Sequence, residues 1–243
     1  MARSVVLNSS PRCVRCYQPR AWCLCAWQEP VGLPWAVDVL MHQGEMVRPT
    51  STGHLIQRLV PGSGQHLFRP AASADAESVR RPGHTLWVLH PFGDDLPAEV
   101  PERLQVVLVD GTWKQASTMV RAISSWGRKV RLPMTGTSRY WLRNQQGEGQ
   151  FSTIEALMFL LEAAGRNDEA RRLRVAFELQ VYAGLSVRGD RRRRDAYLET
   201  SAVRAALTDL LARRDAQLRP VAEAADAPAR PDRPGPDPAG PSG

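Results

Sequence analysis

Four cysteines lie close together near the start of the chain. Cys13 and Cys16 form a Cys-x-x-Cys pair, six residues follow, and Cys23 and Cys25 form a Cys-x-Cys pair; the 243-residue chain has no other cysteine. Zinc takes four soft ligands in a tetrahedron, and short thiolate pairs of this kind supply them two at a time. A redox-active Cys-x-x-Cys is the alternative, but no strand–helix–strand pattern surrounds the pair. The spacing therefore predicts a structural zinc site closed by four protein ligands.

An acidic residue stands where a predicted strand gives way to a predicted helix. Asp110 follows the apolar run 104–109 and opens the segment Asp110-Gly-Thr-Trp113. In open α/β sheets ligands bind outside the carboxyl ends of the strands, and a helix N-terminus there attracts anionic groups. The residues also have a structural interpretation, because Asp110 or Thr112 can serve simply as a helix cap. The helical spacing of Trp113 with later apolar residues favours a core position for its ring over stacking on a ligand.

Two further predicted strands also end in polar loops. The first is followed by residues 42–53, which include His42, Glu45 and Arg48, and the next is followed by His90. Since the carboxyl ends of parallel strands meet at one edge of a sheet, three such loops predict a cleft at that edge. A single histidine after a strand is more often a structural hydrogen-bond partner than a catalyst, so position alone assigns neither histidine a role.

The elements that must position these residues alternate between strands and helices. Continuous apolar runs, typical of strands covered on both faces, predict strands at 35–41, 85–89, 104–109 and 129–132. Helical patterns predict helices at 53–59, 113–123, 168–184 and 195–214, and another that begins at the capping box Ser152-x-x-Glu155. Residues 61–83 resemble a loop, with a weak strand signal at 67–68. This alternation favours a layered α/β fold.

The charge of the chain suits a polyanionic partner. The formal net charge is +7, and Lys114 and Lys129 are the only lysines among 32 Lys and Arg residues. The planar guanidinium group suits phosphate recognition. An arginine-rich and alanine-rich composition also arises from a genome of high G+C content. The run Arg191–Arg194 is a candidate phosphate contact, although such a run is usually a solvated face.

Composition also predicts the domain organisation of the chain and its cellular compartment. No apolar run approaches the ~18–20 residues that a membrane span needs, and the start of the chain lacks a signal-peptide pattern. We therefore expect a cytoplasmic protein with no membrane partner. The segment from about residue 220 is rich in proline, alanine and aspartate and cannot bury enough apolar surface to become ordered. We predict a zinc-binding segment at 1–30, an α/β domain at 31–215 and a disordered tail at 216–243.

Five motifs, taken in order, resemble the DTW-domain family. They are the cysteine cluster, His42-x-x-Glu45 with Arg48-Pro-Thr-Ser-Thr-Gly53, Asp110-Gly-Thr-Trp-Lys-Gln-Ala116, Arg139-Tyr140 with Leu142-Arg143, and Ser152-Thr-Ile-Glu-Ala156. The match runs from about residue 12 to about residue 190. The chain departs from the family pattern in its first loop, with His-Gln where His-Pro is more common and Thr-Ser-Thr where Thr-Asn-Thr is more common.

The resemblance implies a fold and an activity. The fold is an α/β domain similar to the SPOUT-type methyltransferases, with helices on both faces of the sheet and a C-terminal trefoil knot, and residues 31–215 become the catalytic domain. Bacterial members of the family are tRNA-uridine aminocarboxypropyltransferases. The implied reaction moves the 3-amino-3-carboxypropyl group of S-adenosylmethionine to N3 of a uridine in tRNA. Zinc is then a structural ion, and no obligatory protein partner is evident.

Strand-end position and resemblance together assign roles to individual residues. The candidate catalytic residues are Asp110, Glu45 and His42, with Asp110 acting either on the uridine edge and its N3 proton or on the sulfonium. The candidates for binding S-adenosylmethionine are Arg48, Thr50, His90, Gly111, Thr112, Trp113, Ser152 and Thr153. The candidates for RNA contacts are Arg139, Tyr140, Arg143, Arg191 and Arg192.

Two alternatives to this function remain open. One keeps the co-substrate and changes the outcome, giving an S-adenosylmethionine-dependent RNA methyltransferase or an aminocarboxypropyltransferase that acts on rRNA. The other is a non-catalytic RNA-binding protein that uses the zinc loop and arginine patches. A module that only binds RNA would not need an acid at a strand end beside His42, Glu45 and His90.

Overall fold

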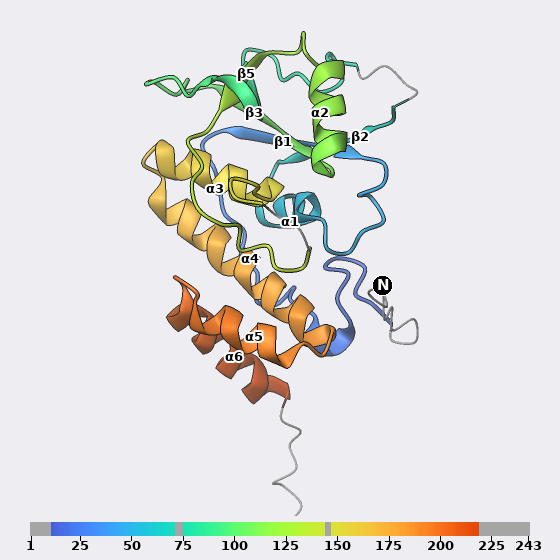
Figure 1. Cartoon of the computed structure of the whole chain (residues 1–243), viewed down its shortest axis with the longest axis vertical. Helices are drawn as coiled ribbons and strands as arrows, with labels where there is room; N and C mark the ends of the chain where they lie inside the picture. The colour runs from blue at the N-terminus through green and yellow to red at the C-terminus, as the bar shows by residue number, and fades with distance from the viewer. Residues whose placement is uncertain (1–10, 71–74, 144–146, 219–243) are drawn as a thin grey trace, which may run out of the picture. The chain divides into compact units, whose positions relative to one another are not determined.

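The computed structural model describes residues 11–70, 75–143 and 147–218 (Figure 1). The chain divides into two compact units, Met1–Leu207 and Thr208–Gly243. The sheet, the cysteine cluster and the candidate site all lie in the first unit. Most of the tail that was predicted to be disordered, residues 219–243, lies outside the described residues. Within the described ranges, no helix is long and apolar enough to cross a membrane.

Five parallel strands form one sheet in the order β2-β1-β4-β3-β5. Their bounds are Ala36–His42 for β1, Gly64–Phe68 for β2, Thr85–Asp95 for β3, Leu104–Asp110 for β4 and Arg128–Arg131 for β5. The four predicted strands are confirmed, and the weak signal at 67–68 belongs to β2. The register pairs Met41 with Asp110, so the carboxyl ends of β1 and β4 lie side by side.

Helices cover both faces of this sheet. The described part of the chain has α1 at Thr52–Leu59, α2 at Trp113–Ala122, α3 at Thr153–Ala163, α4 at Asn167–Val187, α5 at Arg191–Glu199 and α6 at Arg204–Leu218. Alternate residues of β1 pack into separate cores: Val39 and Met41 lie in the cluster with α1, α3 and α4, whereas Leu40 lies in the cluster with α2. Figure 1 shows α2 on one side of the sheet and α1 with α3 on the other. The α/β class with two covered faces is confirmed.

One predicted helix was wrong, because residues 195–214 do not form a single helix. α5 ends at Glu199 and α6 begins at Arg204. The hydroxyl of Thr200 donates to the carbonyl of Ala196 at 2.8 Å, and the Oγ of Ser201 accepts the N–H of Val203 at 3.1 Å. Serine and threonine hydroxyls that bond nearby backbone groups compete with the helix, and here they separate two helices.

A buried carboxylate on β1 anchors the segment that precedes β3. Asp38 is almost fully buried. Arg81 donates to both of its oxygens, at 2.9 and 3.0 Å, while His66 and Gln105 lie at 3.1 and 2.8 Å. Burial by itself would raise the pKa of Asp38, but the hydrogen bonds from His66, Arg81 and Gln105 outweigh it and lower this pKa to about 2. The ionised carboxylate therefore stabilises the fold.

We expect Asp38→Asn to lower the free energy of unfolding by about 2 kcal/mol or more at neutral pH, the value of a pKa shift of this size. Because the folded pKa lies below the unfolded value, this stability is present above pH 4 and is lost as the pH falls toward 2. Urea midpoints of the two proteins between pH 7 and pH 3 measure the difference. A gap between them that stays constant with pH would show that Asp38 contributes packing rather than charge.

Candidate active site

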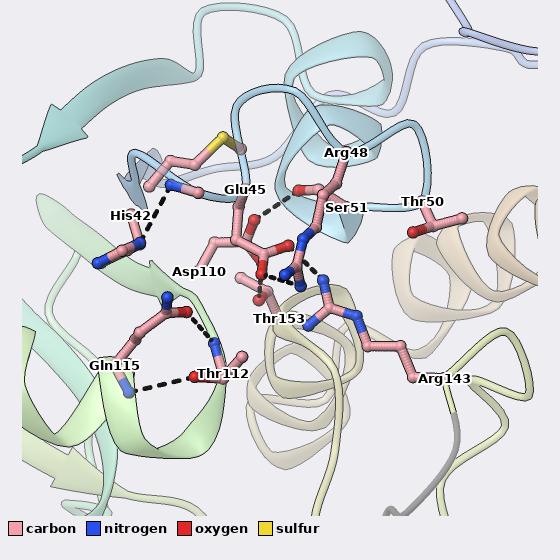
Figure 2. A network of polar contacts seen from close by, with 12 residues as sticks. His42, Glu45, Arg48, Thr50, Ser51, Asp110, Thr112, Gln115, Arg143 and Thr153 are labelled. Atoms are coloured by element: carbon pink, nitrogen blue, oxygen red, sulfur yellow. Dashed lines mark hydrogen bonds and ion pairs between the residues drawn. The ribbon is translucent and has the colours of Figure 1, made fainter. Parts of the chain in front are cut away.

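Three helices begin around one buried carboxylate. Asp110 is only 4% exposed. Ser51, the residue before α1, donates its hydroxyl to Oδ2 of Asp110 at 2.5 Å, and Thr153, the first residue of α3, donates to Oδ1 at 2.6 Å (Figure 2). Asp110 itself lies two residues before Thr112, the N-cap of α2. Since helix N-termini carry partial positive charge, this carboxylate sits where negative charge is favoured.

The capping of α2 shows whether Asp110 or Thr112 is the residue that caps this helix. The Oγ1 of Thr112 accepts the N–H of Gln115 at 3.3 Å, and the Oε1 of Gln115 accepts the N–H of Thr112 at 2.8 Å. Thr112 is thus the helix cap, and Asp110 has hydroxyl partners from two other helices. The predicted capping box of α3 is also confirmed, since Glu155 accepts the N–H of Ser152 at 2.7 Å.

Gly53 allows α1 to approach this carboxylate. A Cβ atom at Gly53 would lie 2.8 Å from Oδ2 of Asp110 and 2.8 Å from Cε of Met41. Any side chain at that position would push the first turn of α1 away from the strand ends. Gly53 closes the motif Arg48–Gly53, but no role could be predicted for it, because a close contact with β4 leaves no signal in the local sequence.

A cavity of about 300 Å³ opens beside Asp110. It lies within the range of small-molecule sites, roughly 300–1,000 Å³. The predicted site residues that line it are His90, Asp110, Gly111, Thr112, Trp113, Tyr140, Arg143, Ser152 and Thr153. Apolar side chains, including Leu89, Leu132 and Met134, complete the wall. The cavity therefore combines apolar contact area with one carboxylate and the N-termini of α2 and α3.

Trp113 belongs to the cavity wall rather than to the core. Its side chain is 38% exposed and lines the cavity. The core position favoured by helical spacing was wrong. The buried face of α2 is formed by Met119 and Val120, so the first turn, which carries Trp113, is left at the cavity.

Glu45 acts within an ion-pair cluster. It is fully buried, and it pairs with Arg48 at 2.9 Å and with Arg143 (Figure 2). Arg143 lines the cavity, whereas Glu45 and Arg48 do not. A buried carboxylate without such partners would cost several kcal/mol. The geometry thus gives Glu45 the task of holding Arg143 at the cavity.

Tyr140 connects the cavity to the loop after β1. Its hydroxyl donates to the carbonyl of Thr50. Burial raises the pKa of Tyr140, which keeps that hydroxyl protonated. Thr50 therefore meets the site through its backbone, by way of Tyr140.

The two predicted histidines occupy different positions. The Nδ1 of His42 accepts the N–H of Gly44 at 3.1 Å, and its ring does not line the cavity. The Nδ1 of His90 accepts the N–H of Phe92 at 3.2 Å, and this residue does line the cavity. Burial, followed by the charge of Lys129, lowers the pKa of His90. His90 is therefore neutral at neutral pH.

The arginines predicted to contact RNA differ in exposure. The guanidinium of Arg139 donates to Glu178 at 3.1 Å and to the carbonyl of Tyr197 at 2.6 Å, and it lies 4.0 Å from the Tyr197 ring centroid. This side chain is engaged inside the fold. Arg191 and Arg192 are exposed at the start of α5.

The four cysteines form a cluster that fits a metal ion. Their sulfur atoms all lie within 4.8 Å of one another; Cys13 and Cys25 are 3.7 Å apart, and Cys16 and Cys23 are 3.8 Å apart. Four Zn–S bonds of ~2.3 Å in a tetrahedron require sulfur separations of about 3.8 Å. The cluster has the dimensions of a zinc site without any rearrangement of the loop.

The pKa values of the cysteines make metal binding to this cluster dependent on pH. Hydrogen bonds from the backbone of Cys16 and Arg15 lower the pKa of Cys13 to about 6, which favours its thiolate. Burial, followed by the hydrogen bond with Cys13, raises the pKa of Cys25 to about 12. Ligation of a metal by all four sulfurs would therefore release protons, and its affinity would rise with pH.

Comparison with known proteins shows the family to which this chain is similar. The DTW domain matches residues 10–183. A similar protein is the tRNA-uridine aminocarboxypropyltransferase 2 of Drosophila melanogaster, which is 28% identical in an alignment of 178 residues that covers 68% of this chain and 70% of the fly protein. No solved structure matches the chain significantly. The matched range contains both the cysteine cluster and the residues around Asp110.

Proposed function

The chain belongs to the DTW-domain family, and on that premise we propose that it transfers the 3-amino-3-carboxypropyl group of S-adenosylmethionine to N3 of a uridine in tRNA. The observation that carries the proposal is the cavity in which Asp110 meets the starts of α1, α2 and α3. The name of the fly relative supports aminocarboxypropyl transfer to a uridine in tRNA.

The cavity complements the charges of S-adenosylmethionine. This co-substrate carries a carboxylate, an ammonium group and a sulfonium beside its adenosine. The N-termini of α2 and α3, at Thr112 and Ser152, suit the carboxylate. Asp110 suits a cationic group, and the half-exposed ring of Trp113 offers a stacking surface for a base.

The proposed chemistry is an in-line substitution. N3 of the uridine attacks the γ-carbon of the methionine chain, the bond from that carbon to sulfur breaks, and its electron pair stays on sulfur in 5′-methylthioadenosine. The N3 proton is lost in the process. Asp110 either accepts that proton or stabilises the sulfonium before attack, and its two hydroxyl partners, Ser51 and Thr153, hold the carboxylate in one orientation for either role.

The packing of the cysteine loop supports a surface for tRNA at the start of α5. Trp22 of this loop lies 6.0 Å from Tyr182 of α4, ring centroid to ring centroid, and the guanidinium of Arg194 lies 5.8 Å from the same tyrosine ring. The loop is thus close to the start of α5, where Arg191 and Arg192 are exposed. We assign phosphate contacts to these two arginines and a structural role to Arg139.

The reaction is tested by supplying two labelled forms of S-adenosylmethionine with unmodified tRNA. We expect label from the carboxyl-labelled form to enter tRNA, and label from the methyl-labelled form to leave in 5′-methylthioadenosine. The opposite distribution would identify a methyltransferase. Transfer of neither label by a protein that still binds tRNA would favour the non-catalytic RNA-binding module.

A further inference from the structure

The strand β3 leaves its ladder beside the cavity. Leu89 pairs with Val130 of β5, and Asp94 pairs with Val130 again, so the four residues between them are looped out. A Cβ atom at Gly93 would lie 2.6 Å from the carbonyl carbon of Lys129 and 2.7 Å from the N of Val130. Only glycine permits this approach to β5. Bulges of this kind commonly redirect side chains next to active sites.

The bulge presents an aromatic ring to solvent. Phe92 is 84% exposed. Its backbone N–H donates to Nδ1 of His90 at 3.2 Å, and the two ring centroids lie 5.4 Å apart. His90 and Pro91, the two residues before it, line the cavity. An exposed ring is thus held at the edge of the cavity by its own backbone and by a buried neighbour.

The charges around Phe92 are compatible with RNA. The acidic residues of the same segment are paired, Asp94 with Arg128 at 3.5 Å and Asp95 with Arg131 at 2.6 Å. Lys129 lies between these two arginines in β5. The three cations outnumber the two carboxylates, so the surface beside the ring does not repel phosphate.

We infer that Phe92 is a base-stacking platform, on which an unstacked nucleobase of the RNA substrate lies at the mouth of the cavity. The inference rests on the proposed function. N3 of uridine is on the base-pairing edge, so an enzyme that modifies it must meet the base unpaired, either in a single-stranded stretch or flipped out of a duplex. Proteins that bind unstacked RNA bases commonly place them on aromatic rings.

The test compares four variants by their affinity for RNA at several salt concentrations. The probes are fluorescein-labelled oligouridylate and an unmodified tRNA transcript. We expect Phe92→Ala and Phe92→Leu to raise the Kd for oligouridylate about tenfold, the effect of losing one base–aromatic stack. Phe92→Tyr should bind like the wild type. The salt dependence of the Kd should be unchanged in the three Phe92 variants, because stacking releases no counterions. Arg191→Ala should reduce that dependence.

Two control measurements show whether the Phe92 substitutions damage the fold or the cavity. Melting temperature and the Kd for S-adenosylmethionine without RNA should be unchanged in the Phe92 variants, which excludes damage to the cavity. The inference is overturned if Phe92→Ala binds like the wild type, if tyrosine does not restore binding, if leucine restores it as well as tyrosine, or if the wild type binds neither probe.

Label transfer by the wild type separates this inference from the proposed function. If carboxyl label never reaches tRNA, the proposed reaction fails, while the aromatic dependence of oligouridylate binding still decides the role of Phe92. If the wild type transfers label and Phe92→Ala binds and transfers equally well, only the platform fails.

Discussion

Replacement of Asp110 with asparagine is expected to reduce the rate of aminocarboxypropyl transfer by roughly two orders of magnitude or more, the range of a lost acid–base or electrostatic group. Asparagine keeps the shape of the side chain and removes its charge. The fold should survive, because the hydroxyl that meets the new NH2 group, of Ser51 or of Thr153, can rotate to accept its hydrogen bond, while the other hydroxyl still donates to the amide oxygen. Melting temperature and zinc content should therefore match the wild type.

Single-turnover assays with carboxyl-labelled S-adenosylmethionine distinguish the two roles of Asp110. If the carboxylate acts on uridine, binding of the co-substrate should weaken less than the rate of transfer. If it faces the sulfonium, both should change by a similar factor. Asp168→Asn is the matched control, since Asp168 is exposed in the first turn of α4, and it should leave both quantities unchanged.

Transfer at the wild-type rate by Asp110→Asn would contradict this assignment. Asp110 would then serve only to join the starts of α1 and α3. Glu45 would be the next acid to test, although its pairs with Arg48 and Arg143 give it a positioning role. Glu45→Gln would leave Arg143 without its carboxylate partner. Because Arg143 lines the cavity, the effect should appear first in the binding of S-adenosylmethionine.

The purified protein should contain about one zinc ion per chain, and Cys16→Ser should lose it. Cys16 is buried among the other three sulfurs. Zinc-finger peptides bind zinc with roughly 10–16 kcal/mol, and ligation is coupled to folding. Even a loss of about 3 kcal/mol should lower the melting temperature by roughly 6–12 °C in a chain of this size.

Metal analysis and thermal melting check this prediction together. Val14→Ser is the matched control, because Val14 lies in the same Cys-x-x-Cys turn, is 86% exposed and offers no thiolate. It should keep its zinc and its melting temperature. Freshly prepared wild-type protein without zinc, or Cys16→Ser with a full complement, would overturn the zinc assignment.

The features that the sequence determined by itself depend on contacts between near neighbours in the chain. The cysteine cluster could be predicted because Cys13 and Cys16 share one turn and Cys23 and Cys25 lie seven residues or more beyond it in the same short loop. The strands β1, β3 and β4 could be predicted because burial on both faces requires continuous apolar runs. The start of α3 could be predicted because a capping box joins residues three positions apart.

Only the tertiary structure decided which of the polar side chains meet. The hydrogen bonds to Asp110 come from Ser51, 59 residues earlier, and Thr153, 43 residues later. No local pattern reports such pairs, because they depend on the strand order that places β1 beside β4. The same reason explains why Arg139 is engaged internally and why Trp113 is exposed at the cavity. Local sequence sets what each segment can form, whereas the partners brought by distant segments decide which side chains remain available for chemistry.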